Sequence, residues 1–166
     1  MKYPIGIQSF ERIIEDGYVY VDKTDLIFRL THEGSIYFLS RPRRFGKSLL
    51  VSTLENYYLG RKELFRGLAM ERLEKEWAVH PVFHVDFNGG NFTNPGELEQ
   101  KISFYLTEWE QLYGLPVRMN ELGYGDRFIQ VLETAHRQTG RRAVVLVDEY
   151  DKPILDVLDV DTSLEE

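Results

Sequence analysis

Two hydrophobic periods alternate along this chain, and together they predict a mixed α/β fold. Apolar residues at helical spacing predict helices over 49–58, over 94–112 and from about 126 to 138. Short continuous apolar runs predict strands at 18–21, 36–39, 82–87 and 143–147. The last run is rich in valine, which is typical of a strand that is buried on both faces of a parallel sheet.

Turn and capping residues predict where several helices begin and end. Ser9 is placed to cap a short helix through Ile14, and Thr24 to cap a second helix. The pair Asn94-Pro95 has the residue types that favour a helix start, with a cap followed by a first-turn proline. Gly60 and Gly140 each follow a periodic segment, so each is expected to end a helix.

The segment 40–48 has the features of a phosphate-binding loop, or Walker A motif. It reads Ser-Arg-Pro-Arg-Arg-Phe-Gly-Lys-Ser and lies between the expected strand at 36–39 and the helix at 49–58. Gly46 allows a tight turn, and the first N–H groups of the helix are free to donate to an anion. Lys47 is expected to contact the β- and γ-phosphates, and Ser48 to ligate Mg²⁺. The expected nucleotide-binding set is Arg43, Arg44, Phe45, Gly46, Lys47, Ser48 and Leu49.

Two residues of this loop depart from the general motif. Arg41 occupies the position, five before Gly46, at which the general pattern has glycine. Pro42 fixes its φ angle and removes one N–H group. The four cations within 41–47 compensate in part, and Arg43 or Arg44 is a candidate for sensing the γ-phosphate. The alternative is a chance Gly-Lys-Ser tripeptide in a basic surface loop.

A second candidate motif follows the valine-rich run, where Asp148 and Glu149 stand at the expected carboxyl end of the strand. Ligands of open α/β sheets bind beyond the carboxyl ends of the strands. Asp148 is therefore expected to hold Mg²⁺ with Ser48, as a Walker B aspartate does, and Glu149 to polarise an attacking water. We expect residues 46–48 to face this acidic pair across a gap wide enough for a triphosphate and its metal ion. The alternative is a solvated acidic turn.

Together these segments resemble one family, the AAA-ATPase-like proteins of bacteria and archaea. The resemblance is carried by the loop at 40–48, by Pro4–Phe10, Tyr20–Thr24 and Pro81–Phe87, and by Val147–Pro153. It implies a P-loop NTPase with three α/β/α layers and a mostly parallel sheet. Residues 1–34 would then be a family-specific segment packed on the nucleotide-binding core at 35–166. Residues 20–24 either border the nucleotide or, through Asp22 and Thr24, shape only a turn and a cap.

The same resemblance implies that the core is incomplete after the Walker B strand. Related ATPases have a further strand later in the sequence, between the phosphate-loop strand and the Asp-Glu strand. We therefore expect a C-terminally truncated fragment with weak or no activity of its own. Such relatives often carry a downstream nuclease-like domain of the PD-(D/E)XK type, which is the expected partner within the same polypeptide.

Composition narrows the remaining function classes. The chain has 166 residues, a net charge of −7 and no cysteine. The negative charge disfavours general binding to nucleic acid or anionic membranes, and the absence of cysteine excludes disulfides and thiolate metal sites. No apolar stretch has the length of a membrane helix or the core of a signal peptide, so we expect a cytoplasmic protein. The four histidines show no metal-ligand spacing.

Three functions are compatible with this sequence. The first is an Mg²⁺-dependent ATPase with Lys47 and Glu149 as its catalytic residues. The second is a nucleotide-dependent switch with little hydrolysis, coupled to the downstream domain through the same site. The third is a phosphotransferase, which is disfavoured because a glutamate beside the metal aspartate suits activation of water.

Overall fold

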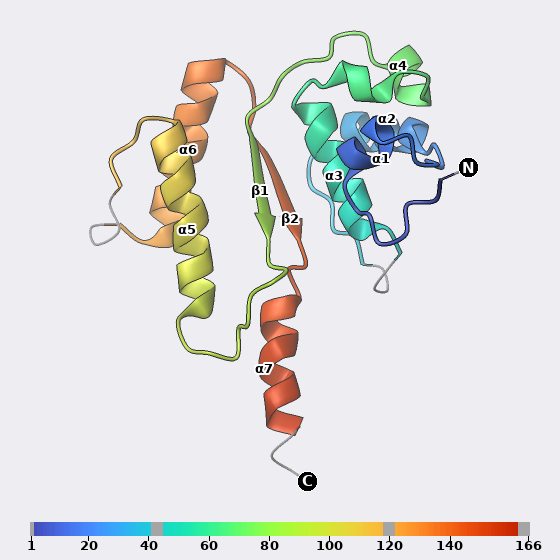
Figure 1. The fold of residues 1–166 in the computed structure, drawn as a ribbon. Helices are drawn as coiled ribbons and strands as arrows, with labels where there is room; N and C mark the ends of the chain where they lie inside the picture. Colours follow the sequence, from blue (N-terminus) through green and yellow to red (C-terminus); the bar gives the residue numbers. More distant parts are fainter. Residues whose placement is uncertain (1, 41–44, 118–121, 163–166) are drawn as a thin grey trace. The chain divides into compact units, whose positions relative to one another are not determined.

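The computed structural model describes residues 2–40, 45–117 and 122–162. It contains helices and one small sheet. In these residues the elements are α1 (Phe10–Glu15), α2 (Thr24–Glu33), α3 (Lys47–Tyr58), the 3₁₀ helix η1 (Lys62–Phe65), α4 (Ala69–Leu73), β1 (Val82–Asp86), α5 (Glu97–Leu112), α6 (Tyr124–Thr139), β2 (Val144–Asp148) and α7 (Lys152–Thr162) (Figure 1). The mixed α/β class is thus confirmed. Contacts divide the chain into two units, Met1–Val82 and Phe83–Glu166. Along the described stretches, no helix combines the length and the apolar composition that crossing a bilayer requires.

The first unit is a set of helices around an aromatic core. Its buried members come from five elements: Phe10, Ile27, Tyr57, Leu64, Phe65 and Met70. Helix α1 packs on α3, and α2 packs on α4. The Ser9 cap is confirmed, because its hydroxyl accepts the N–H of Arg12 at 3.3 Å. Helix α3 therefore has the N-terminal residues of the chain packed along its side.

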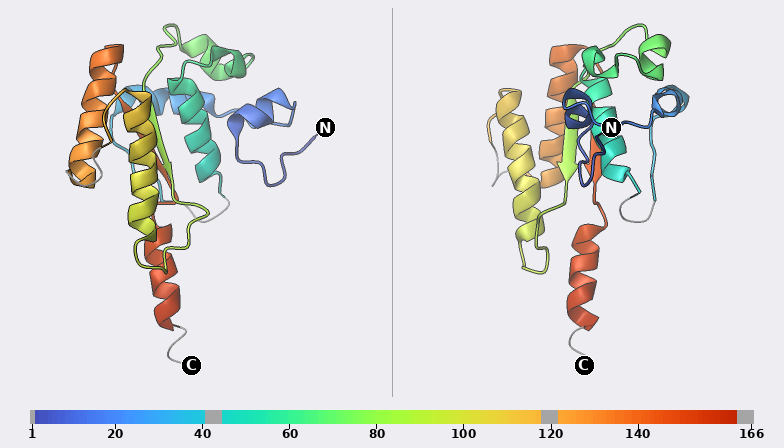
Figure 2. Two further views of the ribbon diagram at one scale, coloured as in Figure 1. Left: turned by 60° about the vertical axis from the view of Figure 1, so that its left-hand side comes forward. Right: turned by 45° about the vertical axis from the view of Figure 1, so that its right-hand side comes forward.

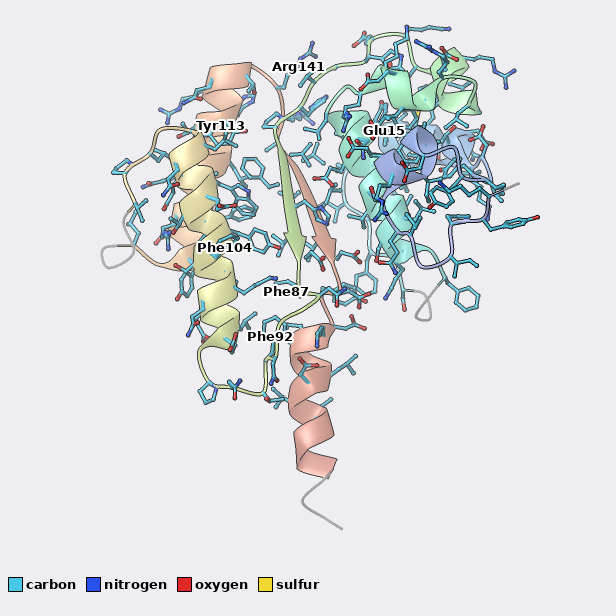
Figure 3. The ribbon with its side chains drawn as sticks, viewed as in Figure 1. Glu15, Phe87, Phe92, Phe104, Tyr113 and Arg141 are labelled. Atoms are coloured by element: carbon cyan, nitrogen blue, oxygen red, sulfur yellow. The ribbon has the colours of Figure 1, made fainter. Side chains whose placement is uncertain are left out.

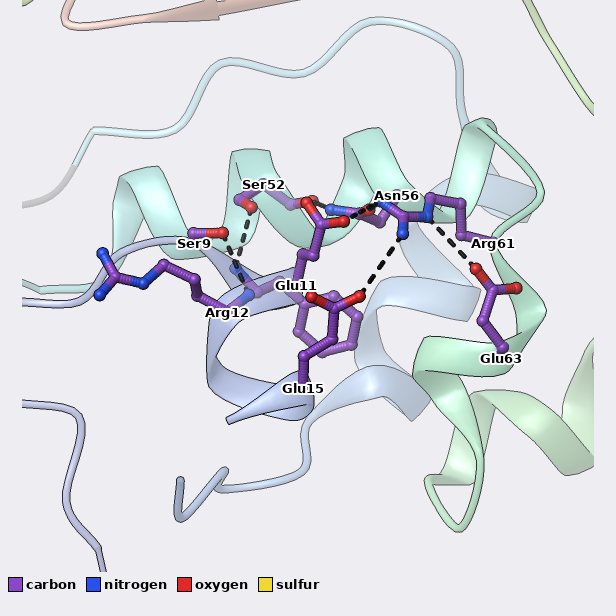
Figure 4. Close-up of polar contacts among 9 residues, drawn as sticks. Ser9, Glu11, Arg12, Glu15, Ser52, Asn56, Arg61 and Glu63 are labelled. Carbon is purple, nitrogen blue, oxygen red and sulfur yellow. Dashed lines mark hydrogen bonds and ion pairs between the residues drawn. The ribbon is translucent and has the colours of Figure 1, made fainter. Parts of the chain in front are cut away.

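Polar contacts reinforce the packing of α1 against α3 (Figure 4). The N–H of Phe10, at the start of α1, donates to the hydroxyl of Ser52 on α3 at 3.0 Å. Beyond the end of α3, Arg61 forms ion pairs with Glu11 and Glu15 of α1 and donates to Asn56 of α3 at 3.3 Å. One guanidinium thus joins both helices at their far ends.

The second unit is built on two parallel strands with α5 and α6 on the same side of the sheet (Figures 1 and 2). Because parallel neighbours need a crossover connection, both helices lie between β1 and β2 in sequence. Phe83 of β1 is the centre of the core and contacts Trp109 edge to face, with ring centroids 5.1 Å apart. Val131 and Ala135 of α6 complete the buried cluster. Trp109 packs against this cluster.

The loop after β1 is tied to α7 (Figure 3). The rings of Phe87 and Phe92 meet edge to face at 5.9 Å, and the N–H of Phe92 donates to Asp156 at 3.2 Å. Asp156 in turn pairs with Lys152 at 2.8 Å on the first turn of α7. These contacts hold the first turn of α7 at the carboxyl end of the sheet.

Two of the expected strands are wrong. Residues 18–21 and 36–39 carry no strand in the structure, although both are apolar runs. A strand needs a neighbour to receive its N–H and C=O groups, and the described part of the first unit contains no strand to provide one. The chain at 36–39 is extended and exposes its apolar side chains, with Ile36 at 92%.

The valine-rich strand is present but is not buried on both faces. Val145 and Val147 are 42% and 43% exposed. They lie on the side of the sheet that faces α5 and α6, beside a cavity of about 300 Å³ that both helices also line. The buried residues of the core cluster on this side include Phe83 of β1 and no residue of β2.

Two expected helix starts are also displaced. Helix α5 begins at Glu97, not at Asn94-Pro95, because Gly96 takes a left-handed φ of 86° and interrupts helical geometry there. Thr24 is the first residue of α2 and not its cap. The N-cap residue is Lys23, and the carboxylate of Asp22 before it accepts the N–H of Thr24 at 2.9 Å. The expected ends at Gly60 and Gly140 are confirmed, with φ of 71° and 67°.

A buried ion pair joins α5 to α6 and gives the first prediction. Arg127 binds Glu110 through two parallel bonds of 2.8 Å, with side chains only 1% and 4% exposed. Arg127→Met leaves a carboxylate buried without its partner, so it should lower the free energy of unfolding by about 3–5 kcal/mol. The double variant Arg127→Met/Glu110→Leu should recover most of this loss. Urea unfolding followed by circular dichroism measures both.

The exposed pair Arg29–Glu33 provides the matched control, since its side chains are 65% and 62% exposed. Arg29→Met should cost less than about 1 kcal/mol. Equal losses for the two arginine variants, or no recovery in the double variant, would contradict the assigned role of the buried pair.

Candidate functional site

A glycine with a left-handed backbone directly precedes α3. Gly46 is the N-cap residue, in a left-handed conformation with φ of 78° and ψ of 20°, and no side chain caps the helix. A Cβ atom at Gly46 would meet nothing within 4 Å. The need for glycine therefore arises from the φ angle and not from crowding, since other residues adopt this angle at a cost of about 1 kcal/mol or more.

The N–H groups of the first turn precede the helical hydrogen bonds. The first such bond runs from the N–H of Leu50 to the carbonyl of Gly46 at 3.0 Å. The N–H groups of Lys47, Ser48 and Leu49 thus lie at the positive end of the helix dipole, where anions bind. The side chains of Lys47 and Ser48 are partly buried, whereas Phe45 is 65% exposed. Arg41, Pro42, Arg43 and Arg44 lie outside the described residues.

The acidic pair lies where the sequence placed it, at the carboxyl end of β2. Asp148 is the last residue of the strand and is 7% exposed. Its side chain accepts the N–H of Glu149 at 3.0 Å, and its carbonyl accepts the N–H of Phe87 at 3.2 Å. One hydrogen bond uses only part of the acceptor capacity of a carboxylate. Asp148 is therefore held in place while it retains capacity for a further ligand.

Glu149 carries an unusual backbone conformation. Its φ of 51° is left-handed, and Trp77 is the other non-glycine residue with positive φ in the described chain. Such a conformation costs about 1–3 kcal/mol and persists only where neighbouring structure holds it. Here the carbonyl of Glu149 accepts the N–H of Lys152 at the start of α7 at 3.1 Å. The strand end, the strained residue and α7 thus form one connected turn.

The side-chain oxygens of Ser48 and Asp148 are of the hard type that Mg²⁺ prefers. Among the described residues, no group of three or more His, Asp or Glu side chains gathers as a metal centre would. Mg²⁺ at a nucleotide does not need such a group, because one or two protein oxygens suffice when phosphates and waters supply the rest. The residue types therefore fit a nucleotide-bound Mg²⁺ better than a protein-only metal site.

The structure brings together the members of each candidate motif. Gly46, Lys47 and Ser48 are consecutive at one helix terminus in the first unit, and Asp148 and Glu149 are consecutive at one strand end in the second unit. Whether the two motifs face one another stays a prediction. The division of the chain at 34/35 also stays a prediction.

Asp22 and Thr24 form hydrogen bonds at the starts of two helices. Asp22 accepts the N–H of Thr24 at 2.9 Å and the N–H of Ala69 at 2.8 Å, at the starts of α2 and α4. The Thr24 hydroxyl donates to Asp22 at 2.7 Å and accepts the N–H of Met70 at 2.9 Å. Both side chains therefore hold two helix starts together. That residues 20–24 border a nucleotide stays a prediction.

Sequence reasoning missed a cavity beside the helix terminus. It has a volume of about 480 Å³ and is lined by Gly46 together with Leu26, Leu30 and Leu39, among others. The leucines of α2 give no sequence signal for it, because helical periodicity does not distinguish a buried face from a face that lines a cavity.

Comparisons with known proteins identify one family to which the chain is similar. The family model described as "Predicted AAA-ATPase" matches residues 4–166. A protein of Azotobacter chroococcum mcd 1, "Uncharacterized protein in vnfD 5'region", is 48% identical over 159 residues. The match covers 95% of this chain but only 30% of that relative. No solved structure matches the chain.

Asp22 gives a prediction about pH. Burial raises its pKa, but hydrogen bonds from Thr24 and Ala69 and the charge of Arg72 outweigh this and bring the pKa below its ordinary value. A depressed pKa means that the carboxylate stabilises the fold above its unfolded pKa of about 3.9, and that this stabilisation is lost as the pH falls through the folded pKa. Asp22→Asn should lower the free energy of unfolding at pH 7 by less than about 1 kcal/mol, because Asp22 is exposed, with a smaller loss at pH 3.

Chemical denaturation at a series of pH values from 7 to 3 tests this expectation. Asp25→Asn is the matched control, because it removes an acidic charge from the first turn of the same helix, at a residue that is not one of the caps. A loss for Asp22→Asn that stays constant down to pH 3 would show that the charge of Asp22 does not stabilise the helix starts.

Proposed function

Because this chain belongs to the predicted AAA-ATPase family, we propose that it binds ATP with Mg²⁺ and that the full-length protein hydrolyses ATP. The single observation that carries the proposal is the uncapped start of α3, with Gly46 left-handed directly before Lys47 and Ser48. A helix terminus without a side-chain cap leaves its N–H groups for another acceptor. A phosphate is the acceptor that the adjacent lysine suits best.

Each residue of the helix terminus has a proposed role. The N–H groups of residues 47–49 donate to phosphate oxygens, and the ammonium of Lys47 neutralises charge on the β- and γ-phosphates, in the transition state above all. The hydroxyl of Ser48 is a ligand of Mg²⁺. Phe45 and Leu49 flank the phosphates, and Arg43 or Arg44 contacts the γ-phosphate.

The acidic strand end has two proposed roles. Asp148 holds Mg²⁺, directly or through a water, and the metal supplies charge neutralisation between the phosphates when bound. Glu149 orients the attacking water and accepts its proton. The backbone strain at Glu149 supports this role, because strained residues gather at sites where a side chain must be aimed.

Hydrolysis requires both motifs to act on the same triphosphate. In the full-length protein we propose a three-layer P-loop fold. The chain spans about 30% of the length of the relative from Azotobacter chroococcum, and a downstream nuclease-like domain is part of the proposal. A cytoplasmic location stays a prediction.

Binding of Mg²⁺-ATP gives the next prediction. A ligand that binds only the folded state stabilises it, by about 2.7 kcal/mol at a concentration of 100 times Kd. Mg²⁺-ATP should therefore raise the Tm of the chain, and Lys47→Ala should remove most of this rise. Differential scanning fluorimetry with and without nucleotide measures both effects.

Lys62→Ala is the matched control, because Lys62 is an exposed lysine of the same unit on η1. It removes the same charge and should retain the full rise in Tm. A rise that survives Lys47→Ala unchanged, or no rise in the unmodified chain, would contradict the proposed phosphate site.

Catalysis gives a separate prediction for the full-length protein. Glu149→Gln keeps the size of the side chain but removes the base, so kcat for ATP hydrolysis should fall by about 10²-fold or more while ATP binding is retained. Glu108→Gln on the exposed side of α5 is the control and should leave kcat unchanged. Release of phosphate measured under saturating ATP gives both values.

The values of kcat and of ATP affinity distinguish an ATPase from a nucleotide-dependent switch. An unchanged kcat in Glu149→Gln would exclude Glu149 as the base. Tight ATP binding with negligible turnover in the unmodified full-length protein would instead favour a switch, in which the bound nucleotide reorganises the downstream domain.

A further inference from the structure

Helix α7 is attached to the carboxyl end of the sheet by polar contacts of its first turn. On α7, Ile154, Val157 and Leu158 are each more than half exposed, so their burial contributes little to holding the helix. The ammonium group of Lys152 instead binds both carboxylate oxygens of Asp156 at 2.8 Å. These two side chains are 25% and 19% exposed, so solvent screens the pair less than it screens a fully exposed one.

Asp156 also binds the loop that follows β1. Its carboxylate accepts the N–H of Phe92 at 3.2 Å, and the ring of Phe92 lies 6.0 Å from the ammonium group of Lys152. Phe92 is only 6% exposed and packs edge to face on Phe87 (Figure 3). A Cβ atom at Gly90 would lie 2.5 Å from the Phe92 ring, so a larger residue there would displace this ring. The loop and the first turn of α7 are therefore fixed to one another around Phe92.

These contacts form a closed circuit that contains Glu149. The circuit starts at Asp148, whose carbonyl accepts the N–H of Phe87 in the loop at 3.2 Å. It returns through the N–H of Lys152, which donates to the carbonyl of Glu149 at 3.1 Å. Glu149, with its left-handed φ of 51°, is thus held by the end of the strand before it and by α7 after it.

We infer that Lys152 and Asp156 are positioning residues for Glu149. The inference rests on the proposed function, because it takes Glu149 as the residue that orients the attacking water. The side-chain pair fixes the start of α7 on the loop, and the start of α7 fixes the carbonyl of Glu149. A left-handed glutamate relaxes to a more favourable φ once its neighbours no longer hold it, and this turns its side chain in a new direction. The carboxylate then leaves the place from which it accepts the proton of the water.

An ion pair between residues four apart also has a purely local effect, which is to stabilise the helix that carries it. Such an effect on α7 would be independent of Glu149. The two roles differ in what loss of the pair does to catalysis. A local role changes stability alone, whereas a positioning role lowers kcat through Glu149 and leaves the affinity for ATP unchanged.

ATP hydrolysis by the full-length protein tests the inference. Lys152→Met keeps a long side chain and removes its charge, so kcat should fall by about tenfold or more while the Kd of ATP changes by less than about twofold. Lys152→Arg retains a cation that binds a carboxylate, so its kcat should stay within about threefold of that of the unmodified protein. Asp156→Asn keeps an acceptor for the N–H of Phe92 but loses the charge, and it should resemble Lys152→Met. Circular dichroism verifies that each variant is folded.

The double variant Lys152→Met/Glu149→Gln separates positioning from a structural role. If Lys152 acts through Glu149, loss of the pair has no further effect once the base is gone. The kcat of the double variant should then equal that of Glu149→Gln within about twofold. A structural defect would act independently, and the two losses would multiply.

Lys101→Met is the matched control. Lys101 of α5 contacts the same loop, because its ammonium group donates to the carbonyl of Asn88 at 3.4 Å, and it lies 5.7 Å from the ring of Tyr105. Neither contact reaches α7. The kcat of this variant should therefore stay within about twofold of that of the unmodified protein.

The results separate two failures. An unchanged kcat in Lys152→Met, losses that multiply in the double variant, or an equal loss in Lys101→Met would overturn the positioning role and leave the proposed function standing. Failure of Lys152→Arg to retain activity would also overturn that role. Absence of ATP hydrolysis by the unmodified full-length protein, or an unchanged kcat in Glu149→Gln alone, would overturn the proposed ATPase mechanism, and the positioning role with it.

Discussion

The unpaired N–H groups at the start of α3 are the constraint on which the first unit depends. A helix that begins without a side-chain cap is stable only if packing holds it elsewhere. Here α1 lies along α3, the N–H of Phe10 bonds to Ser52, and Tyr57 enters the aromatic core. The terminus at Gly46 is thus available to a ligand because the rest of the helix is fixed by tertiary contacts.

In the second unit, too, the buried core and the candidate site residues lie in different places. Phe83, Val131 and Ala135 form a rigid core between β1, α5 and α6, and the ion pair of Arg127 with Glu110 fixes the two helices to one another. Strain is found at the opposite end of the sheet, at Glu149, where the chain turns into α7. A stable core can support one strained residue at a strand end, which is the usual location of ligand sites in α/β sheets.

The sequence predicted the local features well because they depend on neighbouring residues. The Ser9 cap, the glycine at 60 and the acidic strand end follow from capping, φ preference and hydrophobic runs. The failures concern partners far along the chain. Residues 36–39 have the composition of a strand but no neighbouring strand in their unit. Thr24 does not cap α2, because its hydroxyl donates to Asp22 and accepts the N–H of Met70 of α4. The cavity beside Gly46 requires three separate segments to meet, which no single stretch of sequence indicates.

The most direct test of the central claim is a titration of the isotopically labelled chain with Mg²⁺-ATP, followed by the backbone amide resonances in NMR spectra. Formation of hydrogen bonds to phosphate should shift the amides of Lys47, Ser48 and Leu49 most strongly, with saturation at a common Kd. Large shifts elsewhere, with those three amides unchanged at saturation, would contradict the account.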